Sequence, residues 1–428
     1  MKKQIFYLAA FLMGSSLIFA QNTSAVTSTG NDNMGVVLQV GDLNSATITQ
    51  DGVLNGYGAD SNYAGITQVG YDNESVIDQQ GDENVALATQ LGFGNISNQQ
   101  LGDAGKAEYN FAAVLQVGGY NTADQLQRWD NNTAFISQFG FGNYAEQEQA
   151  TGTDHAIGSF ASIFQVGLGN WASQYQFGEM NTAFATQDGW FNLATQIQEG
   201  DGNYAAVWQK GVGNKSYENQ VGDGNFSWST QKGFGNFSVV NQLGDDNMQF
   251  TSQKGMFNTA FTYQEGDDNF SKTKQKGMFN LASTLQYGDD NTAKTKQYGA
   301  GNMSVTAQLG ESNEAYTKQY GFSNMSVTAQ LGESNEASTK QMGGFNLAGT
   351  LQLGYENEAS TMQDGWGNVS GTLQAGWQNV ASTTQTGAYN LALTTQLGGA
   401  NTSIITQTGN GNMAFVAQFG GQSSYTPQ

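Results

Sequence analysis

The sequence predicts an all-β fold: a two-sided parallel β-solenoid with cross-β stacking, built from about 17 coils of 22 residues. Three observations support this prediction. An 11-residue unit repeats along most of the 428-residue chain, charged residues within the unit keep to alternate positions, and unlike units alternate with a longer period of 22 residues.

The repeat is most regular in residues 170–422. An Asn recurs every 11 residues from Asn170 to Asn412, giving 23 uninterrupted copies, and each is followed by a Gln after six residues and a Gly after eight. The unit N-x-(A/S)-x-x-x-Q-x-G-x-x has no 3.6-residue apolar stripe and is too short for a helical hairpin. We therefore predict a strand of about seven residues closed by a Gly-containing turn. Residues 423–428 are a short C-terminal tail.

Residues 33–169 contain the same unit in a less regular form. It begins at Asn33, and Ser159 stands at one of the Asn positions, so the chain holds 34 units in all. Extra or shifted residues fall at 55–61, 101–109 and 151–158, where we predict local turns or loops. We expect each of these insertions to open the stack of repeats. Residues 21–32 are an N-terminal segment before the first unit.

The charged residues show which side of each strand faces inward. In the 23 regular units, the first, third, fifth and seventh residues after the Asn carry 18 charged side chains, whereas the second and fourth carry only Glu218. The second is Ala or Ser in every unit except at Gln249, and the fourth is Thr in 14 consecutive units. Because successive side chains of a strand alternate, we predict that Asn, the small residue, Thr and Gln share a narrow interior.

Interior amides need partners, since a buried unpaired amide costs about 1–3 kcal/mol. An Asn or Gln stacked on its equivalent in the next coil can donate and accept along the rod axis, which requires unbroken repetition. The Gly of each unit supplies a residue that adopts φ > 0 where the chain reverses. The residues predicted to form these structural ladders include Asn170, Asn181, Asn302, Asn324, Gln176, Gln187, Gln308, Gln330, Gly178, Gly189, Gly310 and Gly332.

The longer period indicates how the strands are arranged. Lys210, Lys232, Lys254 and Lys276 are 22 residues apart, and the segment NMSVTAQLGESNEA occurs unchanged at Asn302 and Asn324. Two unlike strands therefore make one coil, and each sheet forms from every second strand. Stacked parallel, the coils predict a rod roughly 80 Å long with its two sheets about 10 Å apart.

Composition excludes several classes of function. The chain has no Cys and a single His, His155. It therefore lacks the residues needed for disulfides, for Cys/His metal sites and for nucleophile–histidine arrangements that need a second imidazole. We expect no enzymatic activity, no cofactor and no bound metal. A net charge of −21 argues against a nucleic-acid partner.

Residues 1–20 predict a secretory signal peptide. Lys2 and Lys3 precede an apolar run that ends at the small residue Ala20. A transmembrane anchor is the alternative, although Gly14, Ser15 and Ser16 interrupt the run. We expect a secreted chain that begins near Gln21 and has no membrane span.

The signature N-x-A-x-x-x-Q-x-G-x-x-N resembles the curlin repeat of the curli amyloid subunits, and the resemblance covers nearly all of the chain after residue 32. It implies a secreted structural subunit that polymerises with itself at the cell surface into cross-β fibres of a biofilm matrix. It also implies a curli-type secretion pore, chaperones and a nucleator as partners. The chain differs from the usual curlin subunit in having many more coils and in placing Asn where alternate repeats often begin with Ser.

Other functions remain open. A monomeric β-solenoid adhesin would use the same repeats. Paired acids such as Asp245 and Asp246 fall in turns and could collect Ca²⁺, and turn tryptophans (Trp190, Trp366 and Trp377) could bind glycans. A regular Thr column can bind ice, but only if it faces outward. One strand type carries outward Lys residues and the other outward Leu, Met and Val, so lateral pairing of filaments is also open.

Overall fold

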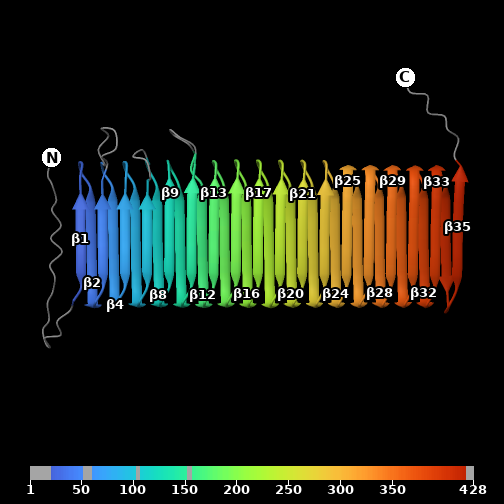
Figure 1. The fold of residues 1–428 in the computed structure, drawn as a ribbon, viewed down its shortest axis with the longest axis horizontal. Coiled ribbons are helices and arrows are strands. Elements are labelled where there is room, and N and C mark those ends of the chain that lie inside the picture. Colours follow the sequence, from blue (N-terminus) through green and yellow to red (C-terminus); the bar gives the residue numbers. More distant parts are fainter. Residues whose placement is uncertain (1–20, 52–59, 103–106, 152–156, 421–428) are drawn as a thin grey trace, which may run out of the picture.

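The protein is a straight rod of β-strands that lie perpendicular to its long axis (Figure 1). The computed structural model describes residues 21–51, 60–102, 107–151 and 157–420. The predicted signal peptide, His155 and the tail 423–428 lie outside these residues. Within the described ranges, no helix has the length and apolar character needed to cross a membrane.

Two parallel sheets make up the rod. The odd-numbered strands form sheet A: β1 (Thr23–Ser28), β3 (Ser45–Gln50), β5 (Glu74–Gln79), β7 (Ile96–Leu101), β9 (Thr122–Arg128), β11 (Tyr144–Ala150), β13 (Trp171–Phe177), β15 (Leu193–Glu199), β17 (Lys215–Val221), β19 (Phe237–Leu243), β21 (Thr259–Glu265), β23 (Leu281–Tyr287), β25 (Met303–Glu311), β27 (Met325–Glu333), β29 (Leu347–Tyr355), β31 (Val369–Trp377), β33 (Leu391–Gly399) and β35 (Met413–Gly420).

The even-numbered strands form sheet B: β2 (Met34–Asp42), β4 (Tyr63–Tyr71), β6 (Val85–Phe93), β8 (Phe111–Gly119), β10 (Thr133–Phe141), β12 (Phe160–Leu168), β14 (Thr182–Trp190), β16 (Tyr204–Val212), β18 (Phe226–Phe234), β20 (Met248–Met256), β22 (Phe270–Met278), β24 (Thr292–Ala300), β26 (Glu314–Phe322), β28 (Glu336–Gly344), β30 (Glu358–Trp366), β32 (Val380–Ala388) and β34 (Thr402–Thr408).

Each strand pairs in parallel with the strand two places along the chain. In β25 and β27, for example, Met303 lies beside Met325 and Gln308 beside Gln330. The backbone N–H of Met303 donates to the carbonyl oxygen of Asn324 at 2.8 Å, which continues the pairing into the turn. The predicted two-sided parallel β-solenoid of about 17 coils is therefore confirmed.

The strands are often longer, and the turns tighter, than the repeat suggested. Where β25 passes into β26, only Ser312 and Asn313 separate the two strands, so Gly310 belongs to the strand end and not to the turn itself. Gly310 has φ of 117°, and a Cβ there would lie 2.1 Å from the carbonyl oxygen of Gly332 in the next coil. Glycine is thus required both for the backbone conformation and for the close approach of successive coils.

The expectation that insertions open the stack is wrong for the strands, which pair across all three, although the Gln ladder of sheet A is interrupted at Leu101, beside the second insertion. Across the first insertion, the Nδ2 of Asn73 still donates to the Oδ1 of Asn44 at 2.9 Å, although the two are 29 residues apart. Across the third, Gln138 still donates to Gln165 at 2.9 Å. All three insertions fall between an odd strand and the following even strand, at one edge of the rod. Extra residues there lengthen the connection without shifting the strand that follows.

One strand lies in the segment that the sequence left without a repeat. β1 pairs with β3, and the Oδ1 of Asn22 accepts hydrogen bonds from the backbone N–H of Asn44 at 3.0 Å and from its Nδ2 at 3.1 Å. Asn22, Ser24 and Gly30 keep the offsets of the repeat, but Ser28 replaces the Gln. Without the Gln, this unit does not match the pattern of the other repeats.

The interior has the predicted residues, and it changes along the rod. Asn, Ala or Ser, and Gln are buried in almost every coil, and the interior position four residues after the Asn is a buried Thr from β20 to β33. In the first coils this position is apolar, as at Ile48, Ile66 and Ile77. It is apolar again near the C-terminal end, where Ile405 is buried.

Candidate functional site

Buried glutamines form a ladder in each sheet, unbroken in sheet B from Gln39 to Gln407 and interrupted in sheet A at Leu101. The Nε2 of Gln308 donates to the Oε1 of Gln330 at 2.9 Å, and its own Oε1 accepts from Gln286 at 2.9 Å. The same Nε2 also lies 3.0 Å from the carbonyl oxygen of Thr292, in the opposite sheet. Each Gln therefore links three strands, and every donor in the ladder points toward the C-terminal end of the rod.

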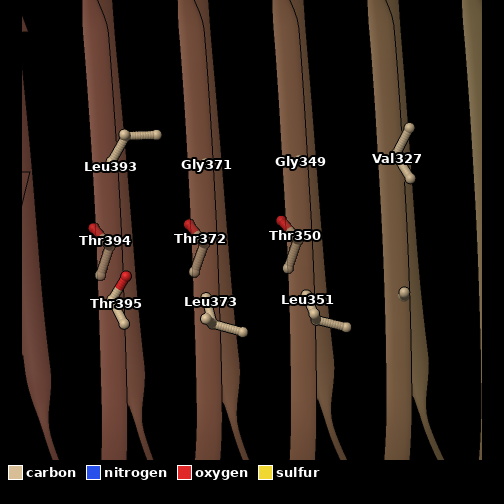
Figure 2. Close-up of a pocket in the computed structure, with 11 residues that line it drawn as sticks. Val327, Gly349, Thr350, Leu351, Gly371, Thr372, Leu373, Leu393, Thr394 and Thr395 are labelled. Atoms are coloured by element: carbon tan, nitrogen blue, oxygen red, sulfur yellow. The ribbon is translucent and has the colours of Figure 1, made fainter. Parts of the chain in front are cut away.

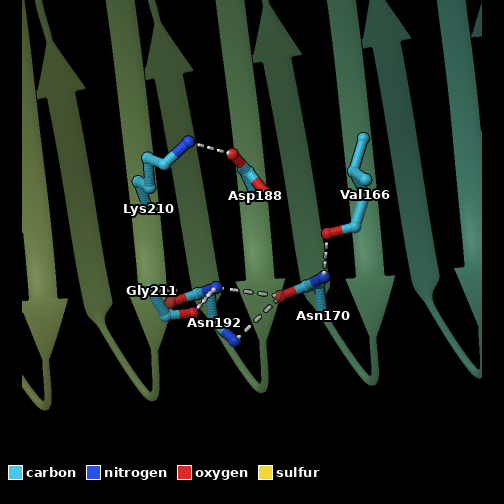
Figure 3. A network of polar contacts seen from close by, with 6 residues as sticks. All are labelled: Val166, Asn170, Asp188, Asn192, Lys210 and Gly211. Atoms are coloured by element: carbon cyan, nitrogen blue, oxygen red, sulfur yellow. Dashed lines mark hydrogen bonds and ion pairs between the residues drawn. The ribbon is translucent and has the colours of Figure 1, made fainter.

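Buried asparagines form ladders that run the opposite way. The Nδ2 of Asn192 donates to the Oδ1 of Asn170 at 3.0 Å, and the backbone N–H of Asn192 donates to the same oxygen at 3.1 Å (Figure 3). The Nδ2 of Asn192 also lies 3.0 Å from the carbonyl oxygen of Gly211. The donors of the Asn ladders point toward the N-terminal end, so the two kinds of ladder give the rod a chemical polarity.

The twelve ladder residues named from the sequence all occupy these arrangements. The Asn and Gln side chains among them are at most 1% exposed, and the four glycines have positive φ. Asn302 meets Asn324, Gln308 meets Gln330, and Gly310 lies against Gly332. The other six do not meet in this way: Gln176 and Gln187 bond to Gln198 and Gln209, and Asn170 and Asn181 accept from Asn192 and Asn203.

Sequence reasoning missed a second column of glutamines inside sheet A. It passes from Gln99 through Gln125, Gln147 and Gln174 to Gln196, with each Nε2 donating to the next Oε1 at 2.8–2.9 Å. The signal was available as a second Gln two residues before the invariant one. The column ends where Gln196 donates to the Oε2 of Glu218 at 3.1 Å.

Glu218 is an acidic side chain in an interior of neutral residues. It is 2% exposed, and burial raises its pKa from an ordinary value of 4.5 to about 7, while the nearby hydroxyls of Ser229 and Ser227 and the hydrogen bond from Gln196 oppose the rise. Burial disfavours the charged carboxylate because it cannot be solvated there. Near neutral pH this carboxyl is therefore balanced between its protonated and charged forms.

Aspartates in one line of turns have a structural role. The Oδ1 of Asp267 accepts from the backbone N–H of Asp245 at 2.8 Å, and Asp289 does the same for Asp267 at 2.9 Å. The second acid of each pair points to solvent, and the pKa of Asp268 is raised by desolvation and by the nearby charges of Asp290 and Asp246. Within the described ranges, no three acidic or histidine side chains are placed to hold a metal ion.

Ice binding and glycan binding both depend on where the side chains face. The Thr column is buried, as at Thr273 and Thr317, so it does not form the outward surface that ice binding needs. Trp366 packs on Phe345 with ring centroids 5.6 Å apart, and Trp377 stacks on Tyr355 at 6.5 Å. These tryptophans contribute to packing between coils at the edge of the rod.

The ladders end at open strands. At the C-terminal end, Gln418 and Asn412 each bond to the preceding coil, and no later coil in the described part of the chain bonds to the Oδ1 of Asn412. At the N-terminal end, Gln39 donates to Gln68, and no earlier Gln within the described residues donates to its Oε1. One end therefore presents Gln donors and Asn acceptors, and the other presents a Gln acceptor.

Comparison with known proteins agrees with the repeat. Two segments of the chain are similar to the curlin associated repeat: the profile of that family matches residues 59–92, which span β4, β5 and all but the last residue of β6, and residues 387–420, which contain β33–β35. The family is a structural, non-enzymatic one. No curated protein matches the chain.

Proposed function

We propose that the chain is a secreted structural subunit whose copies stack end to end into curli-like, cross-β fibres outside the cell. The observation that carries the proposal is the complementary chemistry of the two rod ends. Because sheet A has 18 strands and sheet B has 17, the next copy continues both sheets after a half-turn about the rod axis, with β34 of one copy beside β1 of the next and β35 beside β2. Open strands also leave unpaired backbone groups that a second copy satisfies.

Side chains at the two ends fit this stacking. Gln418 would donate to Gln39, and Asn22 would donate to Asn401, in the directions that the ladders already have. Ile405 would lie beside Val26 and Val416 beside Val37, so apolar residues would meet at both junctions. Because each copy carries one end of each kind, the addition of copies does not terminate.

The wider role follows from the resemblance to curli subunits. We propose that the fibres contribute to a biofilm matrix and to adhesion, and that export uses a secretion pore of the curli type with its chaperones and a nucleator. Two observations support this: the curlin associated repeats, and an interior whose ladders depend on repetition.

Electron microscopy of the purified chain from Gln21 onward tests the proposal. We expect unbranched fibres with diffraction spacings near ~4.7 Å and ~10 Å. Val416→Lys places an inward charge on the open C-terminal end and should stop growth, since stacking would bury that charge unpaired. Ala417→Lys, with its side chain outward on the same strand, is the matched control. A parent chain that stays a single rod at high concentration would favour a monomeric adhesin instead.

A further inference from the structure

The outer faces of the rod are divided in a diagonal pattern. The outward side chains are those of the first, third, fifth and seventh residues of each strand. On sheet B from β2 to β12 none of them is charged, and they include Val36, Leu38 and Phe164. On sheet A from β23 to β35 none is charged either, and they include Leu351 and Leu373. These two apolar faces lie on opposite sides and at opposite ends of the rod.

The charged outward residues occupy the other diagonal. Sheet A from β5 to β11 carries five outward acids against one base, Arg128: Glu74, Asp78, Asp124, Glu146 and Glu148. On sheet B, every strand from β18 to β28 carries at least one outward lysine, and only Glu314 and Glu336 oppose them. In a chain of net charge −21, this basic face is a marked segregation of charge.

From this pattern we propose that copies of the chain pair side to side, sheet A of one rod on sheet B of the next, with the two rod axes antiparallel. This arrangement sets the apolar strands of one face against the apolar strands of the other, and the acidic strands β5–β11 against the lysine-bearing strands of sheet B. Sheet A on sheet A, or sheet B on sheet B, sets like charges opposite each other when the rods are parallel. When the rods are antiparallel, pairing of like sheets places charged faces against apolar faces. Sheet A on sheet B with parallel axes also opposes charged and apolar faces.

A single register satisfies both kinds of match. When β11 lies over β22 and β9 over β24, Glu146 faces Lys272 and Asp124 faces Lys294. Further along the same register, Glu148 faces Lys274, Asp78 faces Lys340 and Glu199 faces Lys232. Two pairs of like charge, Glu74 with Glu336 and Asp51 with Asp364, fall near one end. The same alignment lays the apolar strands β23–β31 over β10–β2 with the rods almost flush.

A notch in sheet A fits this register. Gly349 and Gly371 lie side by side on β29 and β31 and leave a hollow of about 430 Å³ between Val327 and Leu393 (Figure 2). In the proposed register Gly371 faces Val36 of the second copy, whose side chain is 39% exposed in the single rod. The hollow thus receives an apolar side chain at a position where the backbone alone forms the surface.

The size and spacing of the faces favour a second copy as the partner. A face roughly 80 Å long and about 25 Å wide offers on the order of 2,000 Å² per rod, more than the ~800 Å² of a standard interface. Outward side chains recur at the strand spacing of about 4.8 Å, and another rod of this kind matches that spacing along its whole length. The pairing concerns the sides of the rod, so it goes beyond end-to-end stacking and does not depend on it.

Cysteine cross-linking tests the arrangement, because the chain has no Cys of its own. In the chain from Gln21 onward, Glu146→Cys combined with Lys272→Cys should form disulfides between copies under mild oxidation. The two positions lie on opposite faces, so no link forms within one copy. The matched control combines Glu146→Cys with Phe164→Cys, which would meet if the rods were parallel. We expect a yield on the order of tenfold higher for the first pair.

A charge exchange supplies an independent readout. Lys272→Glu with Lys274→Glu should reduce side-by-side bundling of rods or fibres in electron micrographs, and adding Glu146→Lys with Glu148→Lys should restore it. Equal cross-linking of the two cysteine pairs, preference for the control pair, or no rescue of bundling would overturn the proposal. Fibre growth is scored in the same samples. A failure of end-to-end stacking therefore shows as absent fibres, separately from the cross-linking result.

Discussion

Gln196 donates a hydrogen bond of 3.1 Å from its Nε2 to the Oε2 of Glu218, and this bond ends the second amide column of sheet A. Beyond Glu218, the next residue of the column is Val240. Ser227 and Ser229 face the carboxyl from sheet B, and neither is titratable. The carboxyl of Glu218 is therefore surrounded by neutral groups on every side.

The free energy of unfolding should fall as pH rises through this carboxyl's pKa. The folded pKa, about 7, is above the ordinary 4.5, so the folded state binds the proton more tightly. The stabilising contribution is complete below pH 4.5 and is lost by about pH 7, with a total of about 3 kcal/mol. Denaturant titrations between pH 4 and about pH 8 measure the slope.

Glu218→Gln should remove this slope, because Gln extends the amide column without a charge, and should make the rod more stable at about pH 8 than the parent. Glu358→Gln changes an exposed outward acid and serves as the control. A parent and a Glu218→Gln variant with the same pH profile would show that the carboxyl is not confined as described.

Breaking an inward ladder should matter more than removing an outward charge. Gln308→Ala leaves the Nε2 of Gln286 and the Oε1 of Gln330 without their ladder partner, at a cost of about 2–3 kcal/mol. Lys318→Ala, on an outward position, should cost less than about 0.5 kcal/mol. Amyloid-dye kinetics should show a longer lag for the first variant alone. Equal lag times would remove the assignment of inside and outside.

Gly310 and Gly349 form a matched pair for testing the coil spacing. Gly310→Ala forces a Cβ to within 2.1 Å of the carbonyl oxygen of Gly332, so neighbouring coils must move apart, and we expect a loss of several kcal/mol, at least ~3. A Cβ on Gly349 meets no atom within 4 Å. Gly349→Ala should leave the midpoint of thermal unfolding unchanged or slightly higher.

Thr317 should tolerate loss of its hydroxyl. The residue is 2% exposed, and its Oγ1 has no hydrogen-bond partner within the described structure. Replacing an unpaired buried hydroxyl with a methyl group of similar size should stabilise the rod by about 1 kcal/mol, so Thr317→Val should raise the denaturant midpoint. A lower midpoint would mean that the hydroxyl is paired after all. Val240 and Ile405 already occupy equivalent interior positions elsewhere.

The predictable part of this protein follows from its period. Because one 11-residue unit recurs, the same local preferences and the same alternation apply in every coil, and the strand type, the inward face and the ladder residues all follow from the offsets. The pairing of every second strand follows from the 22-residue period. Gln308, for example, lies against Gln330 as the repeat predicts.

Three features required the tertiary structure. An insertion changes the sequence separation of ladder partners, yet Asn73 still meets Asn44, because pairing depends on where a strand is placed and not on the length of its connection. The strand β1 forms although Ser28 breaks the pattern, because pairing with β3 supplies its hydrogen bonds. The pKa of Glu218 depends on the strands that bury it from both sheets.

The diagonal pattern of charged and apolar outer faces depends on the whole rod. The sequence determined that Lys272 and Leu351 face outward, because parity alone sets the side of a strand. It did not determine how the charged and apolar strands lie relative to one another. The acids of β5–β11 lie on the opposite face from the apolar strands β2–β12. They lie on the same face as the apolar strands β23–β35, but at the opposite end of the rod. That relation exists only once 35 strands are divided between two sheets and stacked in order, since it compares residues that are far apart in the chain and never touch within one copy.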